Sequence, residues 1–181
     1  LMQAVLADLA LETEAAMQLS FHLAHCYEVD DALSVAWKRI MTPASKFWIC
    51  KRAVELTGEM MEVFGGNGYV DNGMMARIFK EAPVNTIWEG SGNVMCLDVL
   101  RAISRDVESI EILFQDLAAT AMWDETLKDE LQSLLKLLQQ SPEEIQFMGR
   151  SLVSRLVILA QAVLLKRHAP DYVADGFIQS R

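Results

Sequence analysis

The sequence predicts an all-α protein, an antiparallel bundle of long helices with a helical C-terminal extension. Apolar residues recur at helical spacing along most of the 181 residues. No run of alternating β-branched residues is long enough to predict a strand. Seven of the nine glycines lie between positions 58 and 92, so we expect the backbone to depart from helix mainly in that segment.

The first two helices are predicted by uninterrupted apolar periodicity. Residues 1–27 contain no Gly or Pro and predict one helix of about seven turns. Asp30 and Asp31 offer an N-cap for a second helix that begins near Ala32 and ends near Val63. Because Pro43 lacks the N–H that an interior helical position needs, we expect a break or kink there, with Thr42 capping the continuation.

The helical pattern resumes after the glycine-dense segment. It begins again at Val94 and continues to Leu117 without interruption, which predicts a long helix. Asp124 predicts the start of a shorter helix that ends near Leu138. The run Ser141-Pro142-Glu143-Glu144 is a capping box with proline at the first helical position, and it opens a last long helix to about His168.

Composition excludes several classes of protein. The 25 acidic residues against 16 basic ones give a net charge of −9, which opposes nucleic-acid or anionic-membrane binding through bulk charge. The spacing of the three cysteines, Cys26, Cys50 and Cys96, fits neither a disulfide framework nor a zinc site, and predicts reduced, buried thiols in a cytoplasmic protein. His22 and His25 share a helix face without acidic partners, so we expect packing there and no metal.

Two further expectations concern the extent of the chain. The most apolar stretch, residues 156–165, has about half the length that a membrane span needs, so we expect no membrane contact. Residue 1 is Leu and already lies within a helical pattern, so we expect the chain to be a fragment of a longer protein.

The glycine-dense segment contains two candidate functional features. The run Phe64-Gly65-Gly66-Asn67-Gly68-Tyr69 frees backbone amides near a helix end, where they can bind phosphate or a polar cofactor edge. A plain helix C-cap is the alternative.

Glu89 lies between an apolar pair and a flexible turn, where loss of water would raise its pKa toward that of a general base. The alternative is a solvated glutamate before a helix N-terminus. We expect Glu89 to be shielded from water and close to the diglycine bend.

Three motifs in this region resemble the C-terminal helical domain of the acyl-CoA dehydrogenases. They are Phe64-Gly65-Gly66-x-Gly68-Tyr69, Arg77-x-x-Lys80-Glu81 and Ile87-x-Glu89-Gly90-Ser91. The resemblance covers about residues 1–110. Segments 42–52 and 82–101 resemble the DNA-alkylation (adaptive) response branch, the isovaleryl-CoA-dehydrogenase-like proteins with an additional C-terminal extension, which here is residues 111–181.

The resemblance implies a flavoenzyme. In that family the residue matched by Glu89 removes the α-proton of an acyl-CoA thioester while FAD accepts hydride from the β-carbon. Part of the FAD is held across a subunit interface, which implies a homo-oligomer. The residues implied to hold FAD are Gly65, Gly66, Ser91 and Asn93, together with Glu62, which stands where the family usually has Gln. The family's N-terminal helical and middle β-domains are absent from this chain, so we expect it alone to be inactive and not to retain FAD.

The alternative is a non-catalytic helical module for oligomerisation and double-stranded DNA binding in a DNA-damage response. Proteins of this branch are associated with double-stranded DNA through the extension, and residues 146–181 carry a local charge of +3. The candidate DNA contacts are Arg101, Arg105, Arg150, Arg155, Lys166 and Arg167. Their binding would be phosphate-directed and salt-dependent. A solvated helix face is the other interpretation of these charges. For the whole chain, the third interpretation is a helical bundle in which the motifs are a structural relic.

Overall fold

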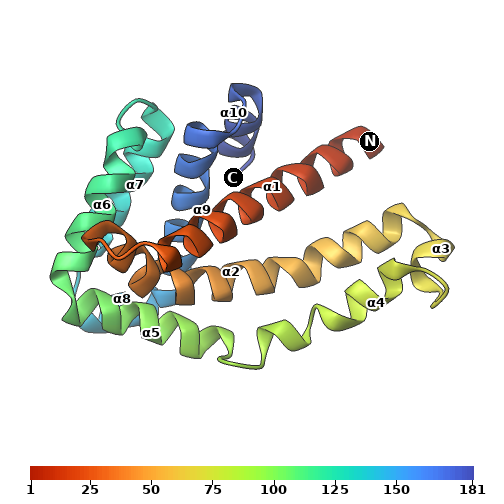
Figure 1. Ribbon diagram of the computed structural model, residues 1–181, viewed down its shortest axis with the longest axis horizontal. Coiled ribbons are helices and arrows are strands. Elements are labelled where there is room, and N and C mark those ends of the chain that lie inside the picture. The colour runs from red at the N-terminus through yellow and green to blue at the C-terminus, as the bar shows by residue number, and fades with distance from the viewer.

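Two long antiparallel helices form the frame of the protein. The computed structural model describes residues 1–181, in which α1 spans Met2–Glu28 and α2 spans Ala32–Val63. Figure 1 shows α1 and α2 running in opposite directions, with the next segments returning beside α2. Those segments are α3 (Gly66–Tyr69), α4 (Met74–Glu81) and the 3-10 helix η1 (Val84–Thr86).

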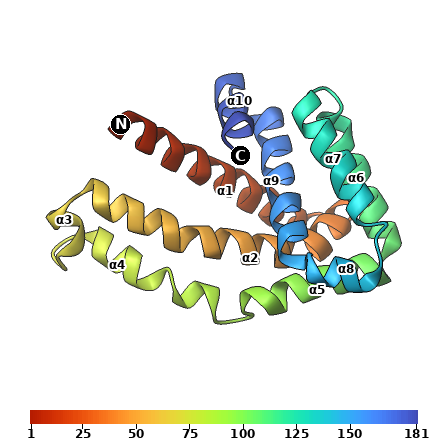
Figure 2. The same cartoon turned by 180° about the vertical axis from the view of Figure 1, so that it is seen from behind.

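The remaining helices complete an all-α fold. They are α5 (Gly92–Arg105), α6 (Val107–Ala121), α7 (Glu125–Leu137), α8 (Pro142–Phe147), α9 (Gly149–His168) and α10 (Asp171–Ser180). Figure 2 shows α6 and α7 at the end of the molecule away from α3, with α9 and α10 nearer the middle, beside α1. The predicted fold class is confirmed: the chain contains helices and no strand. None of the helices has both the length and the apolar character required to cross a bilayer.

Helix α9 is the central element of the hydrophobic core. It packs against α1, α2, α5, α6, α7, α8 and α10. Apolar residues such as Leu152, Leu156 and Leu164 lie buried on several sides of it, which is typical of a helix surrounded by others. The core cluster joins residues of α9 to residues of α1 and α2. The C-terminal segment therefore shares one core with the helices that precede it.

The break expected at Pro43 does not occur. Helix α2 is continuous over 32 residues with Pro43 inside it, although proline removes one interior hydrogen bond. Ile40, Met41, Ala44 and Phe47 on either side are all buried in the core. Tertiary packing around the proline holds the helical path that local propensity disfavours.

Two predicted long helices are each divided in the structure. The helix expected over 94–117 is interrupted at Asp106, whose side chain accepts a hydrogen bond from the Ser109 N–H (3.2 Å) and so caps α6. The helix expected from Pro142 to His168 is interrupted at Met148. The predicted caps themselves are confirmed at Asp31 and Asp124 and in the capping box at Ser141. Helix α10 was not predicted.

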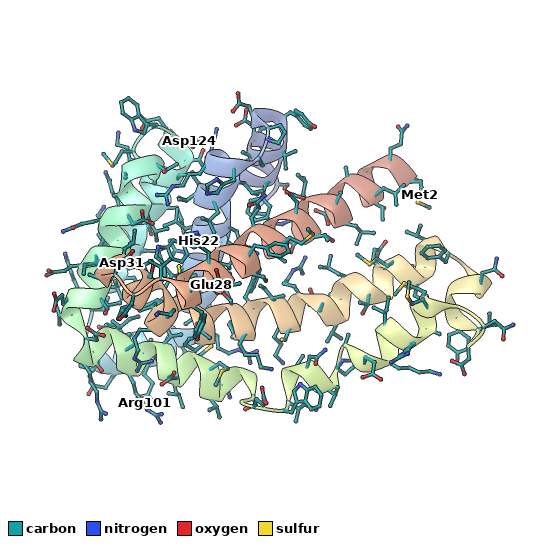
Figure 3. All side chains as sticks on the ribbon, in the orientation of Figure 1. Met2, His22, Glu28, Asp31, Arg101 and Asp124 are labelled. Carbon is teal, nitrogen blue, oxygen red and sulfur yellow. The ribbon has the colours of Figure 1, made fainter.

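A polar cluster connects four helices at one end of the core. The indole N–H of the fully buried Trp37 on α2 donates to Asp116 on α6 (3.0 Å). Arg167 on α9 donates to the same carboxylate (3.1 Å) and to the Thr120 hydroxyl (2.8 Å). His22 on α1 packs edge-on against the Trp37 ring at 4.3 Å, and its Nε2 is buried without a hydrogen-bond partner. Figure 3 shows His22 where α1 approaches α2.

This cluster generates a prediction about pH. Burial lowers the pKa of His22 from 6.5; the Asp116 carboxylate opposes that shift, and Arg167, His168 and His25 add to it. The unfolded chain then binds the proton more readily than the folded one. The contribution of His22 to stability is therefore fully present above its unfolded pKa and is lost as the pH drops below that value. We expect the urea midpoint to decrease as the pH is lowered from about 7.5 to about 5.5, and to decrease less in His22→Phe. Equal losses in both proteins would contradict this role for His22.

Candidate functional site

Glu89 occupies a strained turn between η1 and α5. Its φ is +54°, and it is the only residue other than glycine with a positive φ. A non-glycine residue in this region costs on the order of 1–3 kcal/mol, and the surrounding structure must hold it there. Strain of this kind concentrates at functional positions, so the turn at Glu89 is a candidate site on geometric grounds alone.

Hydrogen bonds fix the backbone on the N-terminal side of this turn. The Val84 carbonyl accepts from the backbone N–H groups of Ile87 (3.0 Å) and Trp88 (3.2 Å). The Trp88 indole N–H donates to the side-chain oxygen of Asn85 (3.1 Å), and the Lys46 ammonium on α2 donates to the Asn85 backbone carbonyl. The turn that carries Glu89 is therefore attached to α2 through Lys46 and Asn85.

The chain does not shield the Glu89 carboxylate as expected. Glu89 is exposed and its side chain makes no hydrogen bond or ion pair. The adjacent apolar side chains Ile87 and Trp88 are 67% and 58% exposed. The carboxylate is thus open to solvent beside two exposed apolar residues. Only further protein or a ligand could cover it.

The N-terminus of α5 follows directly after Glu89. Ser91 is the N-cap residue, and its hydroxyl accepts no hydrogen bond from the helix. Gly92 lies against α2, where a Cβ would come within 3.2 Å of both Phe47 and Lys51. Asn93 is exposed in the first turn. The Ser91 hydroxyl and the Asn93 side chain are therefore free to contact a ligand.

The diglycine turn begins where α2 ends. Gly65 has a φ of +57°, and a Cβ at Gly68 would lie 2.4 Å from the Met61 carbonyl oxygen, so both positions require glycine. The Gly65 N–H donates to the Glu62 carbonyl (2.9 Å), whereas the N–H groups of Gly66 and Asn67 donate to no other group of the chain. The turn acts as a helix C-cap and also leaves two backbone amides free.

The two candidate features lie far apart, contrary to expectation. Gly92, beside the Glu89 turn, contacts α2 at Phe47, whereas the diglycine turn follows Val63. A rise of 1.5 Å per residue places these two points about 24 Å apart along the helix. Figure 1 shows α3 at one end of the molecule and the connection between α4 and α5 about halfway along α2. One chain does not bring Glu89 and Gly65 together.

Three of the six candidate DNA contacts are held in ion pairs. Arg155 makes two hydrogen bonds to the Glu130 carboxylate (2.7 and 2.8 Å). Lys166 bonds to Asp175 (2.6 Å), an interaction that raises the pKa of Lys166. Arg167 is bound to Asp116.

The other three candidates lie near or on α5. Arg101 and Arg105 are exposed and have no ion-pair partner, and Figure 3 shows Arg101 pointing outward from the molecule. Arg150 lies over the Phe47 ring, with its guanidinium 5.4 Å from the ring centroid, and is also exposed. The free basic groups therefore number fewer than the sequence pattern indicates.

The cysteines differ from one another in burial. Cys26 and Cys96 are buried, as predicted, and burial raises the pKa of Cys96 to about 11. Cys50, also expected to be buried, is only half-buried, and its Sγ lies 3.8 Å from the Lys46 Nζ. No three His, Cys, Asp or Glu side chains come together in a group that could hold a metal ion.

Sequence reasoning did not single out Lys46. Its contact joins positions 39 residues apart, and no local spacing or motif signals it.

Comparison with known proteins adds the family. The model of the acyl-CoA dehydrogenase C-terminal domain matches residues 1–104, more than half of the chain. The chain belongs to the acyl-CoA dehydrogenase family. The matched segment ends at the break between α5 and α6.

Relatives extend the similarity to the helices after residue 104. AidB of Escherichia coli K12 is 36% identical over 180 residues, which is 99% of this chain and 33% of AidB. The crystal structure of Caenorhabditis elegans ACDH-11 in complex with C11-CoA superposes with a TM-score of 0.84 at 27% identity, covering 98% of this chain and 35% of that one. The apo-form of Bd2924 gives a TM-score of 0.81 at 28% identity, with 93% and 33% coverage. The chain spans about a third of the length of these relatives.

The strained turn generates a prediction about stability. Glycine adopts a positive φ without steric cost, so Glu89→Gly should raise the free energy of unfolding by about 1 kcal/mol, the strain relieved less the entropy cost of glycine. Glu89→Gln keeps the strain and should stay within about 0.5 kcal/mol of the wild type. Urea denaturation of the three proteins measures both values, and a Glu89→Gly variant no more stable than Glu89→Gln would refute the strain.

Proposed function

We propose that this chain is the C-terminal part of a flavin-dependent acyl-CoA dehydrogenase-like protein of the alkylation-response branch. In this proposal it supplies the catalytic base, Glu89, and part of the FAD site. The observation that carries the proposal is the position of Glu89, an unpaired carboxylate in a strained turn beside the N-terminus of α5. Membership of the family and the match to AidB over nearly the whole chain support it.

The chemistry assigned to Glu89 is proton abstraction. Its carboxylate, which has no hydrogen-bond partner in the chain, accepts the α-proton of an acyl-CoA thioester. Bound FAD, which the diglycine turn together with Ser91 and Asn93 would hold, would supply the redox chemistry as the hydride acceptor. Closure over Ile87 and Trp88 would exclude water from the carboxylate.

The residues present fit an FAD site. The free N–H groups of Gly66 and Asn67 suit phosphate oxygens, and no atom lies within 4 Å of a Cβ placed on Gly65 or Gly66. Ser91 and Asn93 offer polar side chains near the base. Glu62 is exposed near the diglycine turn, and its negative charge would repel a phosphate there. We therefore place Glu62 at the edge of the proposed FAD site.

The separation of the two features supports an oligomeric arrangement. About 24 Å of α2 lies between them, and the family resemblance implies a cofactor held across a subunit interface, so we infer that Glu89, Ser91 and Asn93 serve one FAD, while the diglycine turn of the same chain serves the FAD of a second copy. This arrangement requires a homo-oligomer, and it agrees with the family's use of a cofactor held across a subunit interface.

Two further elements of the proposal concern the complete protein. A solved relative, ACDH-11, is in complex with C11-CoA, which supports an acyl-CoA as the substrate class. The open setting of Glu89 supports the prediction that this chain alone is inactive and does not retain FAD. We retain the proposed division into residues 1–110 and the extension 111–181 as one of sequence resemblance, because position 110 itself lies within α6.

The base assignment is tested in the complete flavoprotein. Glu89→Gln keeps the shape of the side chain but removes the proton acceptor, so acyl-CoA-dependent flavin reduction should slow by about 10²- to 10⁴-fold while the bound FAD absorbance stays unchanged. Glu111→Gln, which neutralises an exposed and unpaired carboxylate on α6, is the matched control. Full activity in Glu89→Gln would remove Glu89 from the mechanism.

Double-stranded DNA binding is the second candidate function. Arg101 and Arg105 favour it, since they lie one turn apart on α5, exposed and without ion-pair partners. Arg155, Lys166 and Arg167 would each have to break an ion pair to contact DNA. We therefore centre this proposal on Arg101 and Arg105, together with Arg150, which is also exposed and without an ion-pair partner.

Salt dependence tests the DNA proposal. If Arg101 and Arg105 each neutralise a phosphate, the double variant Arg101→Ala/Arg105→Ala should bind duplex DNA more weakly, with the slope of log K against log salt reduced by about 2. Lys136→Ala removes an exposed charge from α7 and should leave the slope unchanged. Identical slopes in the double variant and the wild type would exclude these contacts.

A further inference from the structure

Lys46 is a half-buried cation without a carboxylate partner. Its ammonium contacts only the Asn85 backbone carbonyl and, at 3.8 Å, the Cys50 sulfur. The two arginines of α2 are paired with carboxylates: Arg39 with Asp98, and Arg52 with Glu12 and Glu55. Withdrawing a charge from water without a counter-charge costs free energy, so the Asn85 contact must meet a need of the turn.

The need arises from the course of the backbone after η1. The Pro83 carbonyl accepts from the Thr86 N–H (3.0 Å), and the Val84 carbonyl accepts from the Ile87 and Trp88 N–H groups. The Asn85 carbonyl receives no backbone donor. In a continuing helix its donor would be the Glu89 N–H, but that hydrogen bond is not formed. Lys46 supplies the missing donor from a neighbouring helix.

Asn85 also fixes the residue that precedes Glu89. Its side-chain oxygen accepts from the Trp88 indole (3.1 Å), and its side-chain nitrogen lies 3.4 Å from the Glu81 carbonyl. Lys46 therefore holds Asn85 by its backbone, and Asn85 holds Trp88 by its side chain. The Asn85 backbone is thus held to α2 directly, and the Trp88 side chain is held to it through Asn85.

We propose that Lys46 is the positioning residue for Glu89. By satisfying the Asn85 carbonyl, it prevents that carbonyl from drawing the Glu89 N–H into a further helical turn, which would redirect the Glu89 carboxylate. In this role Lys46 touches neither substrate nor cofactor. The role rests on the proposed function, in which Glu89 is the catalytic base.

Hydrogen exchange in the complete FAD-loaded protein tests the contact without reference to activity. Lys46→Met should accelerate amide exchange over residues 84–90 by about 10- to 100-fold, because a hydrogen bond from a charged group is lost. Lys46→Arg should restore most of the protection. Lys38→Met is the matched control, since Lys38 lies on the same helix and also donates to a backbone carbonyl, that of Val29 (3.5 Å). Exchange in Lys46→Met equal to the wild type would overturn the proposal.

Kinetics separates positioning from a purely structural role. We expect Lys46→Met to lower kcat for acyl-CoA-dependent flavin reduction on the order of 10- to 100-fold, with KM and FAD content unchanged, and Lys46→Arg to recover most of it. Faster exchange with wild-type kcat would overturn the positioning role. If Glu89→Gln itself keeps full activity, the proposed function fails, while the exchange experiment still decides whether Lys46 holds the turn.

Discussion

The uninterrupted helix α2 is the constraint on which the rest of the structure depends. Its 32 residues contact α1, α5, α6 and α9, and the turns at both candidate features are anchored to it. The Glu89 turn is attached at Lys46, and the diglycine turn begins where the helix ends. Because a helix is a rigid spacer, these two features are held at a fixed separation. The function proposed for the chain follows from that separation as much as from the residues.

The C-terminal helices are joined to this frame by interactions that leave few free cations. The Asp116 carboxylate accepts from Trp37 on α2 and from Arg167 on α9, so one half-buried acceptor connects the frame to the segment beyond the family match. Breaking this pair would leave a half-buried charge without its partner and would cost stability. Arg155 and Lys166 are occupied in similar pairs on the surface of the same segment. Basic residues that look available in the sequence therefore serve the packing of the extension.

Local signals in the sequence predicted the fold class and the helix caps, because a cap is a contact between residues two or three positions apart, as at Asp124. The motif segments could be identified because each is a short run of neighbouring residues. Continuity through Pro43 depends on packing from other helices, and the break at Asp106 lies inside an unbroken apolar pattern. The contact of Lys46 and the separation of Glu89 from the diglycine turn depend on how distant segments meet, which periodicity does not specify.

The central claim is that one chain contributes its two features to two different cofactors. The structure of the complete protein with FAD bound, determined by crystallography or electron microscopy, tests it most directly. We expect Glu89 and Ser91 of one chain to contact one FAD, and the Gly65–Gly66 turn of that chain to contact an FAD whose flavin lies beside the Glu89 of another copy. A single FAD that touches both Glu89 and the diglycine turn of the same chain would contradict the account.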